Sequence, residues 1–318
     1  MDIRKAVKAG EVRPTKSLGQ NFLIDAYVVD RIVSAAELDK SDLVIEIGAG
    51  AGALTKRLSQ QAGFVVAVEI DRHLINIIER VMSPYKNYML VNGDILKLDI
   101  HKLLETLGAP EAPLGTQPAA RSLAPALALA LASAPAPAPK HPRLKIISNL
   151  PYYITTPVIM KILEGGLAPA KMVFMMQKEV ADRIVAHPST KAYGALTVSV
   201  NYYTKPRKLF SVPPHCFVPQ PGVESAVLAF EPHDKVPVEL LDKQNFFTVV
   251  RAAFAQRRKQ LANCLIHAGL LPNGRESVRR VFEGIGMPLK VRGEELSIHE
   301  FAQLSNAICV ENLRIIEN

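Results

Sequence analysis

The sequence predicts an α/β protein: a doubly wound, mostly parallel, Rossmann-like sheet followed by a small C-terminal α-helical domain. Three observations lead to this fold class. Short apolar runs alternate with segments of helical periodicity along most of the chain. The glycine-rich segment Gly48–Gly52 follows the first of these runs and leads into a helix. Beyond the turn-rich stretch Glu231–Val236 the periodicity is helical only, which marks a second domain.

The predicted sheet is built from short buried strands that alternate with amphipathic helices. This alternation favours parallel strands, because each helix returns the chain to the edge where the next strand starts. We expect strands over Leu43–Ile47, Phe64–Ile70, Tyr88–Val91, Leu144–Leu150 and Lys171–Gln177, and helices over Ala26–Glu37, Thr55–Gln60, Leu74–Val81, a segment through Ile159, Ile162 and Leu163, and Glu179–Ala186.

The later part of the chain is predicted to be helical. Tyr193–Tyr203 contains β-branched residues that suit a strand, but Leu196, Val200 and Tyr203 share one helical face, which favours a helix. The helical domain is expected over residues 234–318, with helices over Phe246–Leu265, Glu276–Phe282 and Ile298–Val310.

Two segments depart from the pattern of the sheet domain, which is expected over residues 17–233. Residues 1–16 are rich in lysine and arginine with little apolar pattern, so we expect a basic N-terminal arm. Residues 110–142 hold eight of the chain's 23 prolines, together with many alanines. Such a segment neither continues a helix nor buries much area, so 109–142 is predicted to be a disordered surface insertion.

Composition is that of a globular protein: 318 residues, of which 48% are hydrophobic and 21% charged. The formal net charge of +8 favours a polyanionic partner. Cys216, Cys264 and Cys309 are far apart and lack metal-ligand spacing, so reduced thiols are expected and no metal site. With neither a signal peptide nor a membrane span evident, a cytoplasmic protein without membrane contact is expected.

The glycine-rich segment is a candidate cofactor loop. Glycines allow the backbone to approach a ligand, and the free N–H groups at the helix start face it. Gly48, Gly50 and Ala53 also satisfy the loose dinucleotide pattern G-x-G-x-x-[GA], so a nicotinamide oxidoreductase stays open, as does simple tight packing of helix on strand.

Acidic residues beside this loop favour a different cofactor. Glu46 precedes the glycines, Glu69 ends the second predicted strand, and Asp94 follows the third. Glu69 can accept from both ribose hydroxyls, and Asp94 can accept from an adenine amine. A nucleoside cofactor without a pyrophosphate needs acids of this kind rather than an anion cradle, which favours S-adenosylmethionine and a methyltransferase.

The tetrapeptide Asn149-Leu150-Pro151-Tyr152 ends the fourth predicted strand. The Asn149 side-chain carbonyl and the Leu150 backbone carbonyl can accept both hydrogens of an exocyclic amine. Pro151 fixes its own φ, and Tyr152 offers a face on which a flipped base can stack. A strand that merely ends in a proline turn is the alternative for these residues taken alone.

Several segments, in this order along the chain, resemble the ribosomal RNA adenine N6,N6-dimethyltransferases, most closely the bacterial 16S rRNA enzymes (KsgA type). The resemblance extends from about Lys16 to about Ala307. The insertion is far longer than the usual connection in that family. The matching segments are Gln20–Leu23, Glu46–Gly52, Glu69–Asp71, Asp94–Ile95, Asn149–Tyr152, Val212–Val227 and Arg257–Leu261.

The resemblance implies roles for individual residues. The target adenine is expected to be held by Asn149 and Tyr152, with Phe217 stacking against its other face. Phe217 taken alone could equally be a core aromatic, and Asn21 could equally cap the following helix. The implied cofactor contacts are Asn21, Leu23, Gly48, Glu69, Asp94 and Asn149.

Basic residues of the helical domain are candidates for phosphate contacts with structured RNA, although charges on helices are often only a solvated face. The resemblance implies a monomeric enzyme that dimethylates two adjacent adenines in the 3′-terminal hairpin loop of 16S rRNA in the small subunit or its precursor. A 23S rRNA dimethyltransferase of the macrolide-resistance type and a non-catalytic ribosome-assembly factor are the alternatives. The basic residues are Arg251, Arg257, Arg258 and Lys259, then Arg275, Arg279, Arg280, Lys290 and Arg292.

Overall fold

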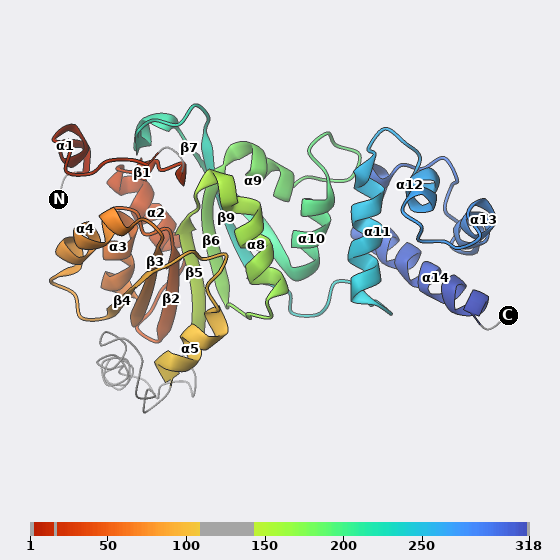
Figure 1. Cartoon of the computed structure of the whole chain (residues 1–318), viewed down its shortest axis with the longest axis horizontal. Coiled ribbons are helices and arrows are strands. Elements are labelled where there is room, and N and C mark those ends of the chain that lie inside the picture. The colour runs from red at the N-terminus through yellow and green to blue at the C-terminus, as the bar shows by residue number, and fades with distance from the viewer. Residues whose placement is uncertain (1–2, 16–17, 109–142, 317–318) are drawn as a thin grey trace. The chain divides into compact units, whose positions relative to one another are not determined.

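The computed structural model describes residues 3–15, 18–108 and 143–316, so the predicted insertion 109–142 lies outside the described residues. The chain divides into two compact units (Figure 1). The first contains Met1–Ala181 and Arg207–Pro232, and the second contains Asp182–Pro206 and His233–Asn318. Residues 182–206, which sequence analysis assigned to the sheet domain, therefore belong to the helical unit.

The first unit is built on a seven-stranded sheet of order β4-β3-β2-β5-β6-β9-β7. The predicted fold class is confirmed, because β4, β3, β2, β5 and β6 are parallel to one another, while β9 runs antiparallel to its neighbour β6. The strands are β2 (Asp42–Ile47), β3 (Phe64–Glu69), β4 (Tyr88–Asn92), β5 (Arg143–Asn149), β6 (Lys171–Gln177), β7 (Thr204–Val212) and β9 (Ser225–Pro232).

Strands β7 and β9 were absent from the sequence prediction. The strand β7 carries Pro206 and several basic residues and forms an edge of the sheet, where a proline and charges are tolerated. The strand β9 is almost wholly buried but directly follows a proline- and glycine-rich segment, which obscured its start. These two strands extend the predicted parallel sheet at one side.

Helices cover both faces of the sheet because the strand order reverses. The chain passes from β2 to β3 in one direction and from β5 to β6 in the other, so right-handed crossovers place α3 (Ala53–Gln61) and α8 (Thr155–Glu164) on opposite faces. The helix α2 (Ala26–Ala35) packs with α3 over Val44, Val65 and Ile147 in one apolar core. Three further helices of this unit are α4 (Arg72–Met82), α5 (Ile100–Gly108) and α9 (Lys178–Ile184), and α9 continues into the second unit.

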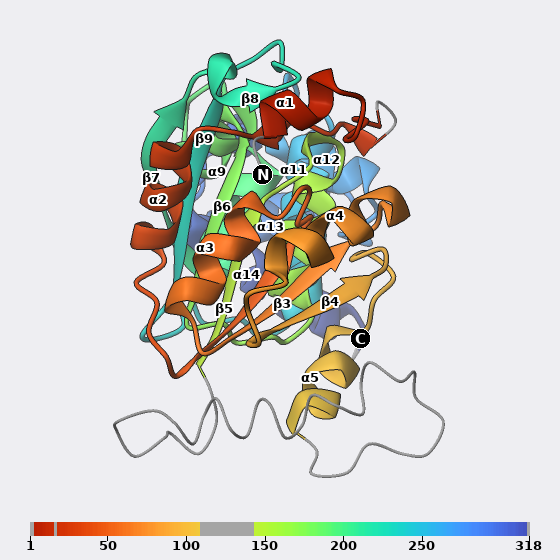
Figure 2. The ribbon, with the colours of Figure 1, turned by 90° about the vertical axis from the view of Figure 1, so that its left-hand side faces the viewer.

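The described part of the predicted basic N-terminal arm, residues 3–15, contains a helix. Helix α1 (Ile3–Lys8) lies beside the two-residue strand β8 (Phe217–Val218), and Figure 2 shows both at the same end of the sheet. Ala6 and Val12 are buried against α4 and the glycine loop. Small apolar residues between basic ones carry this contact, and they produce no visible periodicity.

The second unit has its own helical core. Helices α10 (Ala195–Tyr203), α11 (Lys243–Ala255), α12 (Leu261–His267), α13 (Arg275–Gly284) and α14 (Ile298–Ile316) surround the buried rings of Phe246, Phe282 and Phe301. The helix favoured for Tyr193–Tyr203 is thus confirmed, whereas the single helix predicted over Phe246–Leu265 is wrong. It is interrupted between Ala255 and Leu261. In the described part of the chain no helix is long and apolar enough to cross a membrane.

Candidate active site

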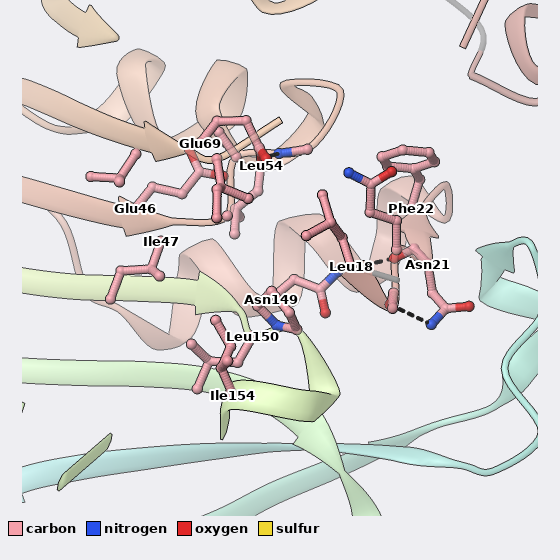
Figure 3. Close-up of a pocket in the computed structure, with 18 of the residues that line it drawn as sticks. Leu18, Asn21, Phe22, Glu46, Ile47, Leu54, Glu69, Asn149, Leu150 and Ile154 are labelled. Atoms are coloured by element: carbon pink, nitrogen blue, oxygen red, sulfur yellow. Dashed lines mark hydrogen bonds between the residues drawn. The ribbon is translucent and has the colours of Figure 1, made fainter. Parts of the chain in front are cut away.

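A pocket opens in the first unit where the strand order reverses, between the carboxyl ends of β2 and β5 (Figure 3). This is the point at which open α/β sheets bind ligands, because the loops leaving the two strands diverge there. The pocket is lined by residues 18–23, by the loop after β2, by the ends of β3 and β4, and by Asn149–Ile154.

The glycine loop forms one wall of the pocket through backbone conformations that favour glycine. Gly48, Gly50 and Gly52 have φ values of 72°, 59° and 80°. A side chain at Gly50 would meet the ring of Phe22 at 3.3 Å. Ala53 then starts α3 with its first turn beside the pocket. The loop backbone therefore packs closely against Phe22 while it lines the pocket.

Two acids from neighbouring strands enter the pocket side by side (Figure 3). Glu69 accepts from the N–H of Gly50 at 2.8 Å and from the N–H of Asp71 at 2.9 Å. Burial raises the pKa of Glu69, against the lowering effect of these two N–H groups. Its carboxylate therefore fixes the glycine loop to the end of β3.

Glu46 is more deeply enclosed than Glu69. It is 1% exposed, and its Oε2 atom has no hydrogen-bond partner among the described residues. Burial, against the lowering effect of hydrogen bonding from Thr55 and reinforced by the Glu69 carboxylate, raises the pKa of Glu46 to about 8. Sequence analysis singled out Glu46 as a sign of a nucleoside cofactor but omitted it from the contact residues. A buried carboxyl oxygen left without a partner in a binding pocket indicates a ligand that completes its hydrogen bonding.

Asn149 stands at the end of β5 with its side chain oriented by a neighbouring segment. Its Nδ2 donates to the backbone oxygen of Asn21 at 3.3 Å (Figure 3). The Oδ1 atom is therefore the one left to accept a hydrogen bond from a ligand. The following N–H, of Leu150, donates to Met175 on β6 at 2.9 Å, which keeps the turn on the sheet.

The other predicted cofactor contacts line the same pocket. Asn21 donates to Gly19, and the cap of α2 is Asp25, so the helix-cap alternative for Asn21 is wrong. Leu23 is buried on the short strand β1 (Phe22–Leu23). Asp94 follows β4 and accepts from the N–H of Leu96 at 2.9 Å through one oxygen. With Gly48, Glu69 and Asn149, the structure brings all the predicted cofactor contacts together.

Tyr152 and Phe217 are placed differently from each other. Tyr152 lines the pocket and is half-buried. Phe217 is 1% exposed, pairs with Leu23 across the β1–β8 ladder and belongs to the apolar core beneath it. The described pocket lining does not include Phe217. Of the two positions that the sequence leaves open for Phe217, the structure shows the one in the apolar core.

The candidate RNA-binding residues lie in the second unit. Arg251 is on α11, whereas Arg257, Arg258 and Lys259 occupy the turn between α11 and α12. All four are exposed, and only Arg257 forms an ion pair in the described part of the chain, with Glu294 at 3.0 Å. Arg280, in contrast, is bound to Glu311 and Glu276. The turn is thus the more available basic surface.

The pocket residues fit S-adenosylmethionine. The glycine loop lines the pocket, Glu69 and Asp94 offer carboxyl groups at the ends of adjacent strands, and Glu46 has a buried oxygen without a partner among the described residues. Within residues 3–15, 18–108 and 143–316, no group of three or more histidine, cysteine or acidic residues is arranged to hold a metal ion.

Known proteins resemble this chain along most of its length. The ribosomal RNA adenine dimethylase family matches residues 12–308. Proteins named ribosomal RNA small subunit methyltransferase A from Bacillus mycoides (strain KBAB4) and Bacillus cereus (strain B4264) are each 42% identical over 299 residues, which cover 94% of this chain and 92% of theirs.

Solved structures show the same fold. A dimethyladenosine transferase from Plasmodium falciparum has a TM-score of 0.67 at 23% identity, covering 88% of this chain and 94% of its own. The 23S rRNA methyltransferase ErmE has a TM-score of 0.60 at 20% identity, covering 91% and 100%. The family match and the Bacillus relatives confirm the resemblance found in the sequence: the chain belongs to the ribosomal RNA adenine dimethylase family.

Proposed function

We propose that this protein is an rRNA adenine N6,N6-dimethyltransferase. It transfers methyl groups from S-adenosylmethionine to two adjacent adenines in the 3′-terminal hairpin loop of 16S rRNA during small-subunit biogenesis. Membership of the dimethylase family supports the reaction, and the names of the relatives at 42% identity support the small subunit as its substrate. We further propose that it acts in the cytoplasm as a monomer.

The orientation of Asn149 is the observation that carries this proposal. Its Nδ2 is engaged by Asn21, so Oδ1 is presented to the pocket as an acceptor. An adenine N6 amine is a donor of two hydrogens, and the Leu150 carbonyl follows in the same turn as a second acceptor. The turn thus matches the exocyclic amine of adenine.

The residues of the turn act on the nucleophile. The lone pair of the N6 amine is delocalised into the adenine ring, which makes the nitrogen a poor nucleophile. Two acceptors at Asn149 and Leu150 draw its hydrogens towards a tetrahedral arrangement and localise the lone pair. Tyr152 stacks on the base and holds it in line. Correct positioning of two reactants supplies much of the rate of such a bimolecular step.

The cofactor is held by residues around the glycine loop. When bound, S-adenosylmethionine supplies an electrophilic sulfonium methyl group. Glu69 and Asp94 accept from the nucleoside, Gly48 lets the backbone approach it, and Asn21, Leu23 and Asn149 close the pocket around it. Glu46 accepts from a donor group of the cofactor. The methylated nitrogen loses its proton to water, so no general base is required.

RNA is held by the basic turn of the second unit. Arg257, Arg258 and Lys259, together with Arg251, contact phosphates of folded rRNA. Each phosphate contact releases counterions, so affinity for the small subunit should fall steeply as salt rises. Arg258→Ala combined with Lys259→Ala should reduce that salt dependence, and an unchanged salt slope would contradict this surface.

Labelling of small subunits tests the proposed reaction. The protein is incubated with labelled S-adenosylmethionine and small subunits from a strain that lacks the methylation, and the RNA is digested to nucleosides. Label in N6,N6-dimethyladenosine of the 3′-terminal hairpin is expected. Asn149→Ala should abolish transfer while cofactor affinity weakens only modestly, and near-normal turnover would contradict its role. Label only in naked 23S rRNA would identify a resistance-type enzyme.

A further inference from the structure

Ser225 contacts Tyr152, the aromatic side chain that we propose stacks on the target base. Its Oγ lies 2.6 Å from the hydroxyl of Tyr152, so the two hydroxyls share a hydrogen bond. Ser225 starts β9 and is fully buried, whereas Tyr152 is half-buried in the wall of the pocket. Nothing in the methyl-transfer chemistry described above uses Ser225.

The position of Ser225 is fixed by the sheet. Ser225 is paired with Gln177 in the antiparallel register of β9 with β6. The preceding residue, Glu224, accepts from the N–H of Lys178 at 2.9 Å. The Ser225 hydroxyl is therefore a rigid point to which a neighbouring side chain can be attached.

The backbone of Tyr152 is fixed independently of its side chain. The oxygen of Pro151 accepts from the N–H of Ile154 at 3.2 Å and from Oγ1 of Thr155 at 3.1 Å. The Tyr152 ring is thus held at its base by the proline turn and at its tip by Ser225. Burial raises the pKa of the Tyr152 phenol, so the hydroxyl stays protonated at neutral pH and the shared hydrogen bond persists.

We propose that Ser225 is a positioning residue for methyl transfer: its hydroxyl sets the angle of the Tyr152 ring on which the target base stacks. This inference rests on the stacking role proposed for Tyr152. A ring released at its tip would present the base in a range of orientations, and fewer of these place the amine in line with the methyl group. Cofactor affinity does not depend on that angle.

A double-mutant cycle tests the inference. We expect Ser225→Ala and Tyr152→Phe each to lower kcat on unmethylated small subunits by roughly fivefold to tenfold, the size of one hydrogen bond. The double variant should be no slower than either single variant, because both remove the same contact. Dissociation constants for S-adenosylmethionine and for the small subunit, measured without turnover, should stay within twofold of wild type. Ser59→Ala is the matched control, since it removes a buried hydroxyl of the same unit that has no partner among the described residues, and it should keep the wild-type kcat.

Three outcomes would overturn the positioning role. The first two are a wild-type kcat in Ser225→Ala and additive losses in the double variant. The third is a loss of kcat in Ser225→Ala that occurs near the melting temperature of the variant and is absent at lower temperatures, because such a loss would come from unfolding. Tyr152→Ala separates this inference from the proposal on which it depends. Normal turnover of Tyr152→Ala would remove the stacking role itself. An inactive Tyr152→Ala beside a normal Ser225→Ala would remove only the role of Ser225.

Discussion

Two buried acids lie at opposite ends of one strand, β2, and differ in the partners around their carboxyl groups. Asp42, at the amino end, is fully buried, with Lys145 Nζ at 2.9 Å and Arg143 Nε at 3.1 Å. Glu46, four residues later at the carboxyl end, is equally buried, but its Oε2 has no partner among the described residues. Lys171, also buried at the amino end of its strand, has the exposed carboxylate of Glu37 at 2.9 Å.

The difference separates an acid that serves the fold from an acid that serves the site. A buried charge destabilises the fold unless it is paired and hydrogen-bonded, so the acids that serve only the fold are matched with cations. An unmatched acid persists where a ligand completes it. The amino edge of the sheet is thus an internally satisfied ion-pair cluster, and the carboxyl edge is a site with an acceptor still to be satisfied.

Breaking the amino-edge cluster should have the largest effect on stability. Asp42→Asn leaves the buried ammonium of Lys145 without its counter-ion, and removal of one partner of a buried pair costs about 3–5 kcal/mol. We expect the urea unfolding midpoint of the first unit to fall accordingly, while cofactor affinity of the folded protein is unchanged. A loss of unfolding free energy below about 1 kcal/mol would mean that the ion pairs of Asp42 do not stabilise the fold, so that Asp42 would not differ from Glu46 in this respect.

The stability of the ligand-free protein should depend on pH through Glu46. Its pKa in the folded protein is about 8, above the ordinary value of 4.5, so folding takes up a proton between these two values. The stabilisation is fully present below pH 4.5 and is lost as pH rises through 8. Between pH 5 and pH 9 we expect a loss of about 4 kcal/mol. Urea unfolding at both pH values measures it.

Glu46→Gln isolates this contribution from that of Glu69, whose pKa is also raised. The amide has a similar shape and does not titrate, so the variant should lose less stability than wild type over the same pH range. Parallel pH profiles for the two proteins would show that Glu46 is not the titrating group.

A smaller effect is expected on cofactor affinity. Glu46→Gln replaces a carboxyl group that can ionise when a donor binds by an amide that cannot, which should raise the dissociation constant of S-adenosylmethionine about tenfold, or about 1.4 kcal/mol. Isothermal titration calorimetry of Glu46→Gln and of Asp42→Asn measures how a change at each end of β2 affects cofactor affinity. Equal affinities for wild type and Glu46→Gln would make Glu46 a structural residue.

Sequence periodicity was sufficient for the parallel strands and for the acids at their ends. A strand buried on both faces is a continuous apolar run, and the carboxyl ends of parallel strands share one edge, so Glu46, Glu69 and Asp94 could be brought together in advance. The edge strand β7 and the packing of Ala6 and Val12 could not be predicted in this way, because both depend on contacts with segments that are distant in the sequence.

The orientation of the site residues was also beyond the sequence. The bond that frees Oδ1 of Asn149 spans 128 residues, and the bond between Tyr152 and Ser225 spans 73. No local pattern encodes such contacts. Phe217 shows the same limit, since its motif suggested a place at the base while its pairing with Leu23 places it in the core.

The smallest effect on stability is expected for an exposed ion pair on the first unit. Asp30 and Arg57 meet at 3.0 Å, as close as the partners of Asp42, but their side chains are 54% and 41% exposed. Water screens the charges and solvates either one when the other is removed, so Asp30→Asn should cost less than about 1 kcal/mol, and the loss should shrink further in salt. The same urea experiment compares it with Asp42→Asn. If Asp30→Asn and Asp42→Asn lost equal stability, the distance between the charged atoms alone would determine the contribution of an ion pair, and burial would add nothing. The contrast between Asp42, which is buried and paired, and Glu46, which is buried and has an oxygen without a partner, would then have no basis.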